Sequence, residues 1–139
     1  MTPVLLDSSV IVALLHRREK RHTECATVIQ ALDRPLATCE AAISESCYVL
    51  RRSPEAVRAV LANVEQGVFD IRFQLSESIA HVSALMKKFS DIPASFADAC
   101  LIQMADELDT GDILTLDTDF LSYRWRRTHR FNLLLPVLG

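Results

Sequence analysis

Residues 4–15 read VLLDSSVIVALL: an apolar run, an acid, two serines and a second apolar run. Val4 to Leu6 predict a short buried strand. Asp7-Ser8-Ser9 predict the start of a helix, because short polar side chains cap helix N-termini, and 10–15 continue that helix on apolar residues. A strand that runs directly into a helix is the opening of an α/β pattern.

The remaining chain repeats this alternation of strands and helices. Ser53-Pro54 is a strong helix start, with Ser as the cap and Pro at the first position, and Gly67 is a fitting stop. Gly111 is expected to end the most apolar helix. We expect helices over 19–33, 40–52, 53–67, 76–88 and 93–108, and strands over 36–38, 68–71, 112–116 and 131–135. The pattern predicts one domain, 1–139, of the α/β class with a mainly parallel sheet covered by helices on both faces.

Composition excludes several other classes of protein. The chain has 139 residues, of which half are hydrophobic and about a quarter charged, with only three Gly and five Pro, so a turn-rich β-sandwich is disfavoured. A net charge of −3 excludes a polybasic protein but allows local basic patches. No signal peptide and no run of roughly 18 apolar residues is visible. The four cysteines, Cys25, Cys39, Cys47 and Cys100, lack zinc-site spacing and predict reduced thiols of a cytoplasmic protein with no membrane span.

Four acids in apolar surroundings are the candidates for chemistry. Asp7 and Asp117 follow the predicted strands of 4–6 and 112–116, at the sheet edge where ligands bind in open α/β folds. Glu45 and Asp98 interrupt apolar helices. Each acid taken alone has an ordinary interpretation: Asp7 as a helix cap, Asp117 as a turn residue and the other two as solvent-facing. Together, with no Lys or Arg adjacent in sequence, they suggest a shared hard cation, Mg²⁺ or Mn²⁺ rather than zinc.

These segments resemble the motifs of a known family. VLLDSSVIVALL (4–15), ISESCYVL (43–50), DIPASFADACLIQMA (91–105) and ILTLDTDF (113–120) look like the motifs of PIN-domain ribonucleases, in the order of the VapC-like toxins of type II toxin–antitoxin pairs. The match runs from residue 4 to about residue 121. One such motif would be weak support, whereas four in order at the family's spacing are strong.

The resemblance implies a three-layer α/β/α sandwich and an Mg²⁺- or Mn²⁺-dependent endoribonuclease. It implies four catalytic acids, three of them metal ligands, with hydroxyls and a further acid in support. The catalytic acids are Asp7, Glu45, Asp98 and Asp117; the ligands are Asp7, Asp98 and Asp117; the supporting residues are Ser8, Thr115 and Asp119. Glu40 is an added acid that we expect at the surface. The bound ion is expected to lower the pKa of a water molecule and offset charge on the scissile phosphate.

Two basic clusters could hold RNA around an acidic site that by itself repels it. Residues 16–22 and 124–130 together contain eight of the fifteen Lys and Arg residues. The first cluster holds Arg17, Arg18, Lys20 and Arg21; the RNA-contact candidates of the second are Arg124, Trp125, Arg126 and Arg127, with Tyr123 beside them as a second stacking aromatic. A solvated surface, with Trp125 packed on the last strand, is the alternative for the second cluster.

The resemblance also implies an antitoxin partner and a homodimer. The amphipathic segment 41–66 is our candidate for the exposed groove that receives an antitoxin helix. A catalytically silent PIN-like module that only binds RNA or protein stays open as an alternative function. A haloacid-dehalogenase-like phosphatase is disfavoured because Ser9 stands where its second Asp belongs, and a phosphorylation receiver because the acidic pair and the late Lys are missing.

Overall fold

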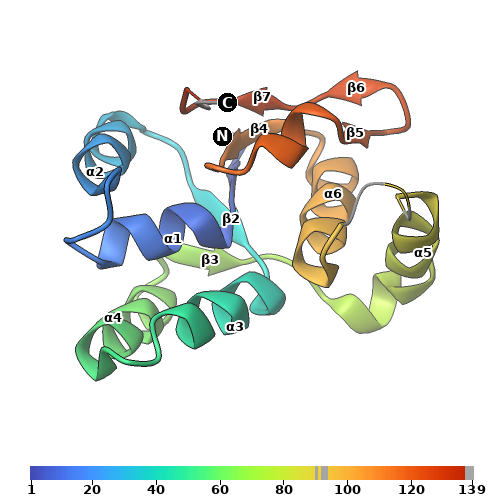
Figure 1. Cartoon of the computed structure of the whole chain (residues 1–139). Helices are drawn as coiled ribbons and strands as arrows, with labels where there is room; N and C mark the ends of the chain where they lie inside the picture. The colour runs from blue at the N-terminus through green and yellow to red at the C-terminus, as the bar shows by residue number, and fades with distance from the viewer. Residues whose placement is uncertain (90, 92–93, 137–139) are drawn as a thin grey trace.

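The computed structural model describes residues 1–89, 91 and 94–136, and its core is a parallel sheet (Figure 1). The sheet strands are β1 (Val4–Leu6), β2 (Leu36–Thr38), β3 (Phe69–Ile71), β4 (Asp112–Leu114) and β7 (Asn132–Leu133). They lie in the order β3-β2-β1-β4-β7, and every neighbouring pair is parallel. The predicted parallel sheet is therefore confirmed, with β1 at its centre.

Helices cover both faces of this sheet, as predicted. They are α1 (Ser8–Leu15), α2 (His22–Ala31), α3 (Glu40–Val49), α4 (Pro54–Glu65), α5 (Leu75–Lys88) and α6 (Phe96–Leu108). Because side chains alternate along a strand, Val4 and Leu6 pack in one hydrophobic cluster with Val10 of α1, whereas Leu5 packs in the other with Met104 of α6. The result is three layers, with α1–α4 on one side and α5 and α6 on the other in Figure 1.

Helix ends follow the sequence signals in most places. Ser53 caps α4 by accepting a hydrogen bond from the Ala56 N–H, and Gly67 follows α4 with φ +78°. The predicted start of the last long helix at Pro93 lies outside the described residues; the structure begins α6 at Phe96, with Ser95 as its cap. The prediction that Gly111 stops this helix is wrong, because Asp109 takes the left-handed conformation at φ 55°.

Gly111 instead allows a close approach. A Cβ built on Gly111 would lie 2.2 Å from Nε1 of Trp125, so only glycine leaves room for the indole on this backbone. Trp125 is half-buried there, and its Nε1 donates a hydrogen bond to the Arg130 carbonyl at 3.2 Å. The indole thus ties the segment after residue 122 to the end of α6.

That segment is a hairpin that the sequence did not predict. Strand β5 (Arg124–Trp125) pairs antiparallel with β6 (His129–Arg130). The turn contains Arg126 and Arg127 at φ 44° and 68°, where glycine or asparagine is the usual sequence signal. After it, β7 spans only Asn132–Leu133 of the predicted 131–135 strand.

The four cysteines carry free thiols, as predicted; three are buried and Cys47 is half-buried. Across the described ranges, no helix has the length and apolar character needed to span a bilayer.

Candidate active site

Asp7 stands at the carboxyl end of the central strand and is held by hydroxyl groups. It directly follows β1 and is 4% exposed. Its Oδ2 accepts hydrogen bonds from Ser9 Oγ at 2.7 Å and from Thr115 Oγ1 at 2.7 Å. Asp7 occupies the cap position of α1, but its side chain makes no capping hydrogen bond. The carboxylate is oriented by hydroxyls rather than used to cap the helix.

Asp117 reaches the same edge from the neighbouring strand. Its backbone N–H donates to Thr115 Oγ1 at 3.0 Å, so the Thr115 hydroxyl connects Asp7 to the turn that carries Asp117. Oδ1 of Asp117 accepts the Asp119 N–H at 2.9 Å and caps the short helix η1 (Thr118–Leu121). Asp117 is half-buried, and its carboxylate is close enough to the buried Asp7 for its charge to act on that residue.

Asp98 faces the sheet from the first turn of α6. It is 7% exposed, so its interpretation as a solvent-facing acid is wrong. Ser95 and Asp98 cap each other: Ser95 Oγ accepts the Asp98 N–H, and Asp98 Oδ2 accepts the Ser95 N–H. The same Oδ2 accepts the Tyr123 hydroxyl at 3.1 Å. These hydrogen bonds fix the carboxylate in one orientation.

Glu45 joins the site at its solvent side. It lies exposed on α3, and its Oε1 accepts the hydroxyl of Ser8 at 3.0 Å. Ser8 is next to Asp7 in sequence, so this bond brings α3 to the start of α1. The structure thus links Glu45 to Asp7, while Glu40, expected at the surface, is exposed.

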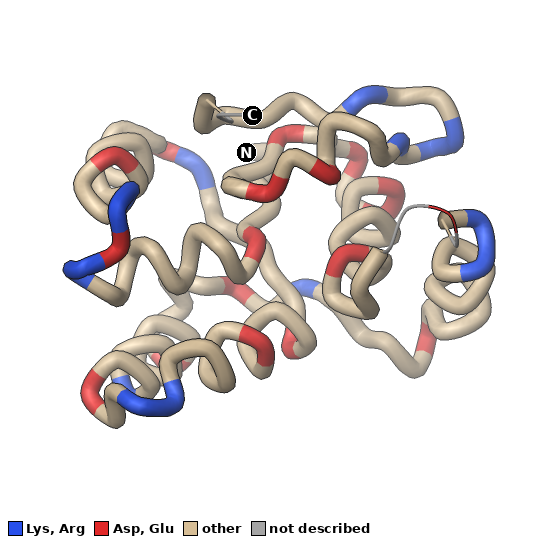
Figure 2. The backbone as a smooth tube through the Cα atoms, in the orientation of Figure 1, with Lys and Arg blue, Asp and Glu red and all other residues tan. Residues whose placement is uncertain are grey.

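The electrostatics of the buried acids reflect their mutual proximity. Burial raises the pKa of Asp7, against the lowering effect of the two hydroxyls, and the charge of Asp117 raises it further. Burial first, and then the charge of Asp7, raise the pKa of Asp98 to about 6, with Asp117 adding to the shift. Burial and the Asp98 carboxylate raise the pKa of Tyr123, which keeps its hydroxyl a donor. Figure 2 shows acidic positions from separate elements around the middle of the molecule, with many of the basic ones at its periphery.

The donor set suits a hard divalent cation. The candidate ligands Asp7, Asp98 and Asp117 offer only carboxylate oxygens, which Mg²⁺ and Mn²⁺ prefer, and their charges raise one another's energy in its absence. Asp98 accepts both of its hydrogen bonds from described residues through Oδ2, so none of those residues donates to Oδ1. With side chains as they stand, the described residues contain no group of three His, Cys, Asp or Glu placed to hold a metal ion.

Two residues of this site were missed in the sequence. Ser9 holds Asp7, and its Oγ also accepts the Leu116 N–H at 2.9 Å, which locks α1 to the end of β4. Tyr123 was expected as a stacking aromatic, but it is fully buried and donates to Asp98, so that expectation is wrong. The double serine after Asp7 was the available signal for Ser9; no local signal distinguishes Tyr123 from an exposed aromatic.

Each basic cluster contains an arginine that is paired with an acid outside the site. Residues 16–21 follow α1 at the end opposite Asp7, and Arg21 pairs with Glu24 at 2.7 Å. In the second cluster, Arg126 pairs with Asp109 at 2.6 Å, and Trp125 stacks against His129 with 4.7 Å between ring centroids. Trp125 packs on Gly111 rather than standing free. This agrees with the alternative in which Trp125 is packed against the protein, although this contact is with Gly111.

Comparisons with known proteins agree with this architecture. The chain is 25% identical to ribonuclease VapC26 of Mycobacterium tuberculosis (strain ATCC 25618 / H37Rv) over 138 residues, which is 98% of this chain and 95% of that protein. The crystal structure of VapC20 of Mycobacterium tuberculosis, a sarcin-ricin loop cleaving toxin, superimposes with a TM-score of 0.80 at 16% identity and covers 91% of this chain and 98% of that one. The PIN domain model matches residues 4–125, and the identification made from the sequence motifs is confirmed: the chain belongs to the PIN domain family.

Proposed function

We propose that this protein is a divalent-metal-dependent endoribonuclease and the toxin of a type II toxin–antitoxin pair, acting in the cytoplasm. The observation that carries the proposal is that Asp7 and Asp117 follow neighbouring parallel strands and are joined through the Thr115 hydroxyl, with the buried Asp98 of α6 near enough to feel their charge. Glu45 adds a carboxylate at the solvent side. The likeness to ribonuclease VapC26 supports the reaction class.

In this proposal the residues of the site have different roles. Asp7, Asp98 and Asp117 would hold Mg²⁺ or Mn²⁺, which supplies a more acidic water and offsets charge on the scissile phosphate. Ser9, Thr115 and Tyr123 fix the directions of the buried carboxylates. Glu45 is exposed and keeps its carboxylate at the mouth of the site, where it can accept a proton from water or orient it. Asp119 lies two residues after Asp117 and adds negative charge near Tyr123.

The test removes one carboxylate at a time. Asp7→Asn, Glu45→Gln and Asp98→Asn should each lower cleavage of total cellular RNA by at least 10–100-fold in Mg²⁺, the usual cost of disturbing a metal site. Glu40→Gln is the matched control, because Glu40 is an exposed acid at the start of the same helix as Glu45. If any of these three variants is folded and cleaves RNA as fast as the wild type, the assignment of the substituted residue is wrong. Binding of RNA without cleavage by the wild type would favour the silent module.

RNA contacts on the hairpin are part of this proposal. Arg124 and Arg127 form no ion pair with any described residue, so their charges are available to phosphates. Arg126 is already paired with Asp109, and Trp125 is half-buried, so we assign these two to shaping the hairpin as well as to contact. Replacing all three arginines by Ala should reduce the slope of log affinity against log salt by about 0.7 for each phosphate that is no longer bound.

The partner surface is proposed on the helices that carry Glu45. Tyr48 and Val49 at the end of α3 are 65% and 54% exposed, and Leu61 of α4 is 51% exposed. Exposed apolar side chains grouped on neighbouring helices favour a protein interface. We place an antitoxin helix or the second copy of a homodimer on this face. Co-expression with the product of an adjacent antitoxin gene should relieve toxicity, and Leu61→Lys should weaken that rescue; a non-toxic, strictly monomeric protein would contradict the proposal.

A further inference from the structure

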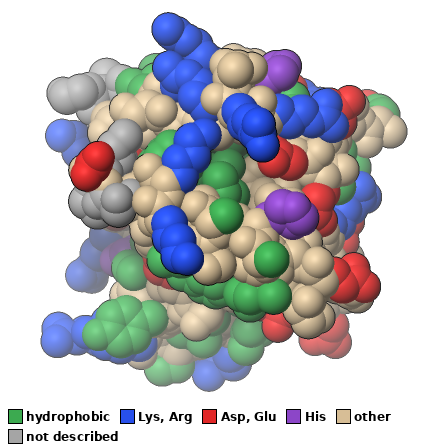
Figure 3. Space-filling view, turned by 90° about the vertical axis from the view of Figure 1, so that its right-hand side faces the viewer, with side chains coloured by type: hydrophobic (Ala, Val, Ile, Leu, Met, Phe, Trp, Pro, Cys, Tyr) green, Lys and Arg blue, Asp and Glu red, His purple; other side chains and the backbone are tan. Residues whose placement is uncertain are grey.

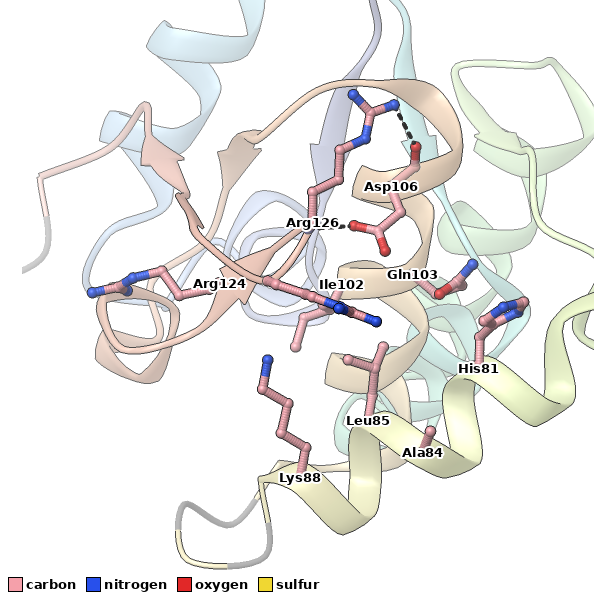
Figure 4. A pocket seen from close by; sticks show the side chains of 10 residues that line it. His81, Ala84, Leu85, Lys88, Ile102, Gln103, Asp106, Arg124 and Arg126 are labelled. Carbon is pink, nitrogen blue, oxygen red and sulfur yellow. Dashed lines mark hydrogen bonds between the residues drawn. The ribbon is translucent and has the colours of Figure 1, made fainter.

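A pocket distinct from the acidic site lies between α5, α6 and the hairpin. Its volume is about 210 Å³, smaller than the roughly 300–1,000 Å³ of sites for drug-sized ligands. Figure 4 shows Leu85 and Ala84 on α5 facing Ile102 and Gln103 on α6, with the hairpin above them. None of the four carboxylates Asp7, Glu45, Asp98 and Asp117 lines this pocket, so it is a separate feature of the surface.

The rim of this pocket is basic. Lys88 of α5 and Arg124 and Arg127 of the hairpin are among its lining residues. In Figure 4 Lys88 points toward the hairpin, whereas the Arg124 guanidinium points away from the pocket and donates to the Leu121 and Tyr123 carbonyls. None of the three forms an ion pair within the described part of the chain. Figure 3 shows this face of the molecule, where Lys and Arg side chains gather around a hollow with hydrophobic side chains at its edge. The pocket therefore combines an apolar floor with a surplus of positive charge.

The hairpin is held in a disfavoured conformation that presents Arg127. Arg126 and Arg127 both have positive φ, which side chains disfavour. Two acids hold the turn. Asp106 Oδ1 accepts a hydrogen bond from the backbone N–H of Arg126 at 2.7 Å, and Asp109 Oδ1 accepts one from the Arg126 guanidinium at 2.6 Å. Strain maintained by specific contacts points to a function for the residue it positions. Here the strained turn brings Arg127 to the pocket rim.

Polar groups in the pocket suit a base as well as a phosphate. Gln103 is 7% exposed, and its amide donates to Glu107 at 3.1 Å, which leaves its carbonyl oxygen as an acceptor. No hydrogen bond from the described residues reaches that oxygen. A planar ligand with N–H donors can lie on Ala84 and Leu85, which keep exposed surface, and donate to Gln103, while an attached phosphate meets Lys88 and Arg127.

We propose that this pocket binds one nucleotide unit of an RNA strand, with the base on the apolar floor and the phosphate at the basic rim. It is an anchoring site for RNA outside the cleavage site, and as such it rests on the proposed nuclease function. The buried amide of Gln103 distinguishes this pocket from the hollow lined by Arg17 and Arg18, whose polar side chains are all exposed.

The test measures binding of a labelled single-stranded RNA of roughly 12 nucleotides, a length within the usual range of single-strand sites, in EDTA so that no cleavage occurs. Arg127→Gly removes the cation and relieves the positive φ, so the fold should be kept. Ala84→Leu fills the pocket from an exposed position on α5 without changing charge. Arg130→Ala is the matched control, because it removes a charge from the same hairpin but outside the pocket lining.

We expect at least fivefold weaker binding for Arg127→Gly and for Ala84→Leu, and less than twofold for Arg130→Ala. The salt slope should fall by about 0.7 for Arg127→Gly and stay unchanged for Ala84→Leu. Equal losses for Arg127→Gly and Arg130→Ala, no effect of Ala84→Leu, or equally tight binding of polyglutamate would each overturn the inference. Failure of the wild type to cleave RNA in Mg²⁺ would instead overturn the nuclease proposal, since the binding test does not depend on cleavage.

Discussion

Replacing Asp98 with Asn should stabilise the metal-free protein at neutral pH. Burial and the charges of Asp7 and Asp117 raise the pKa of Asp98 from 3.8 to about 6, so its ionised form is disfavoured in the folded state. This difference corresponds to roughly 3 kcal/mol at about 1.36 kcal/mol per pKa unit. Asn keeps an oxygen that accepts from Ser95 and Tyr123, so the variant removes the charge and retains these hydrogen bonds. We expect a gain of about 1–3 kcal/mol in the free energy of unfolding at pH 8.

The pH dependence of this gain follows from the sign of the shift. Because the folded-state pKa lies above the unfolded value, the folded wild type binds the proton more tightly, so it loses stability as the pH rises from about 4 to above 6. The difference between Asp98→Asn and wild type should therefore be small below pH 4 and reach its full size above pH 6.

Urea unfolding in EDTA between pH 4 and pH 8, followed by circular dichroism, measures this directly. Mg²⁺ added at pH 8 should stabilise the wild type by mass action and the variant less, which reverses the order. An Asp98→Asn protein that is less stable than wild type in EDTA at pH 8 would refute the reasoning. So would wild-type unfolding that does not respond to Mg²⁺ at concentrations that support cleavage.

Other substitutions separate positioning from chemistry and packing. Tyr123→Phe removes the hydroxyl that orients Asp98 and should lower cleavage at a cost of about 1 kcal/mol in stability, measured by single-turnover cleavage and thermal melting; unchanged cleavage would exclude the positioning role. Gly111→Ala places a Cβ within 2.2 Å of Trp125 Nε1 and should destabilise the protein by roughly 1–3 kcal/mol. Fluorescence of Trp125, the sole tryptophan, reports the displaced hairpin, and an unchanged spectrum and melt would contradict the packing. Glu45→Gln should leave urea unfolding within about 0.5 kcal/mol of wild type while cleavage is lost, because Glu45 is exposed; a large destabilisation would make it structural.

The parallel α/β architecture and the positions of the acids along the chain can be predicted from local sequence patterns. Apolar runs such as Ile113-Leu114 end at polar residues, and this local pattern is sufficient to predict strands with helices between them. Parallel strands end at a common edge, so the sequence pattern alone places Asp7 and Asp117 together. Local periodicity and the rules of strand connection carry that information.

The groups that orient these acids, and the hairpin that carries the second basic cluster, become visible only when the chain is folded. Tyr123 lies 25 positions from Asp98, and Thr115 lies 108 positions from Asp7, and no local pattern states that their side chains meet. The hairpin turn has no glycine or asparagine to announce it, because contacts of Arg126 with Asp106 and Asp109 hold a conformation that the turn residues themselves disfavour. Side-chain burial and hydrogen bonding depend on chain segments that folding brings together, and local sequence preferences contain no information about these contacts.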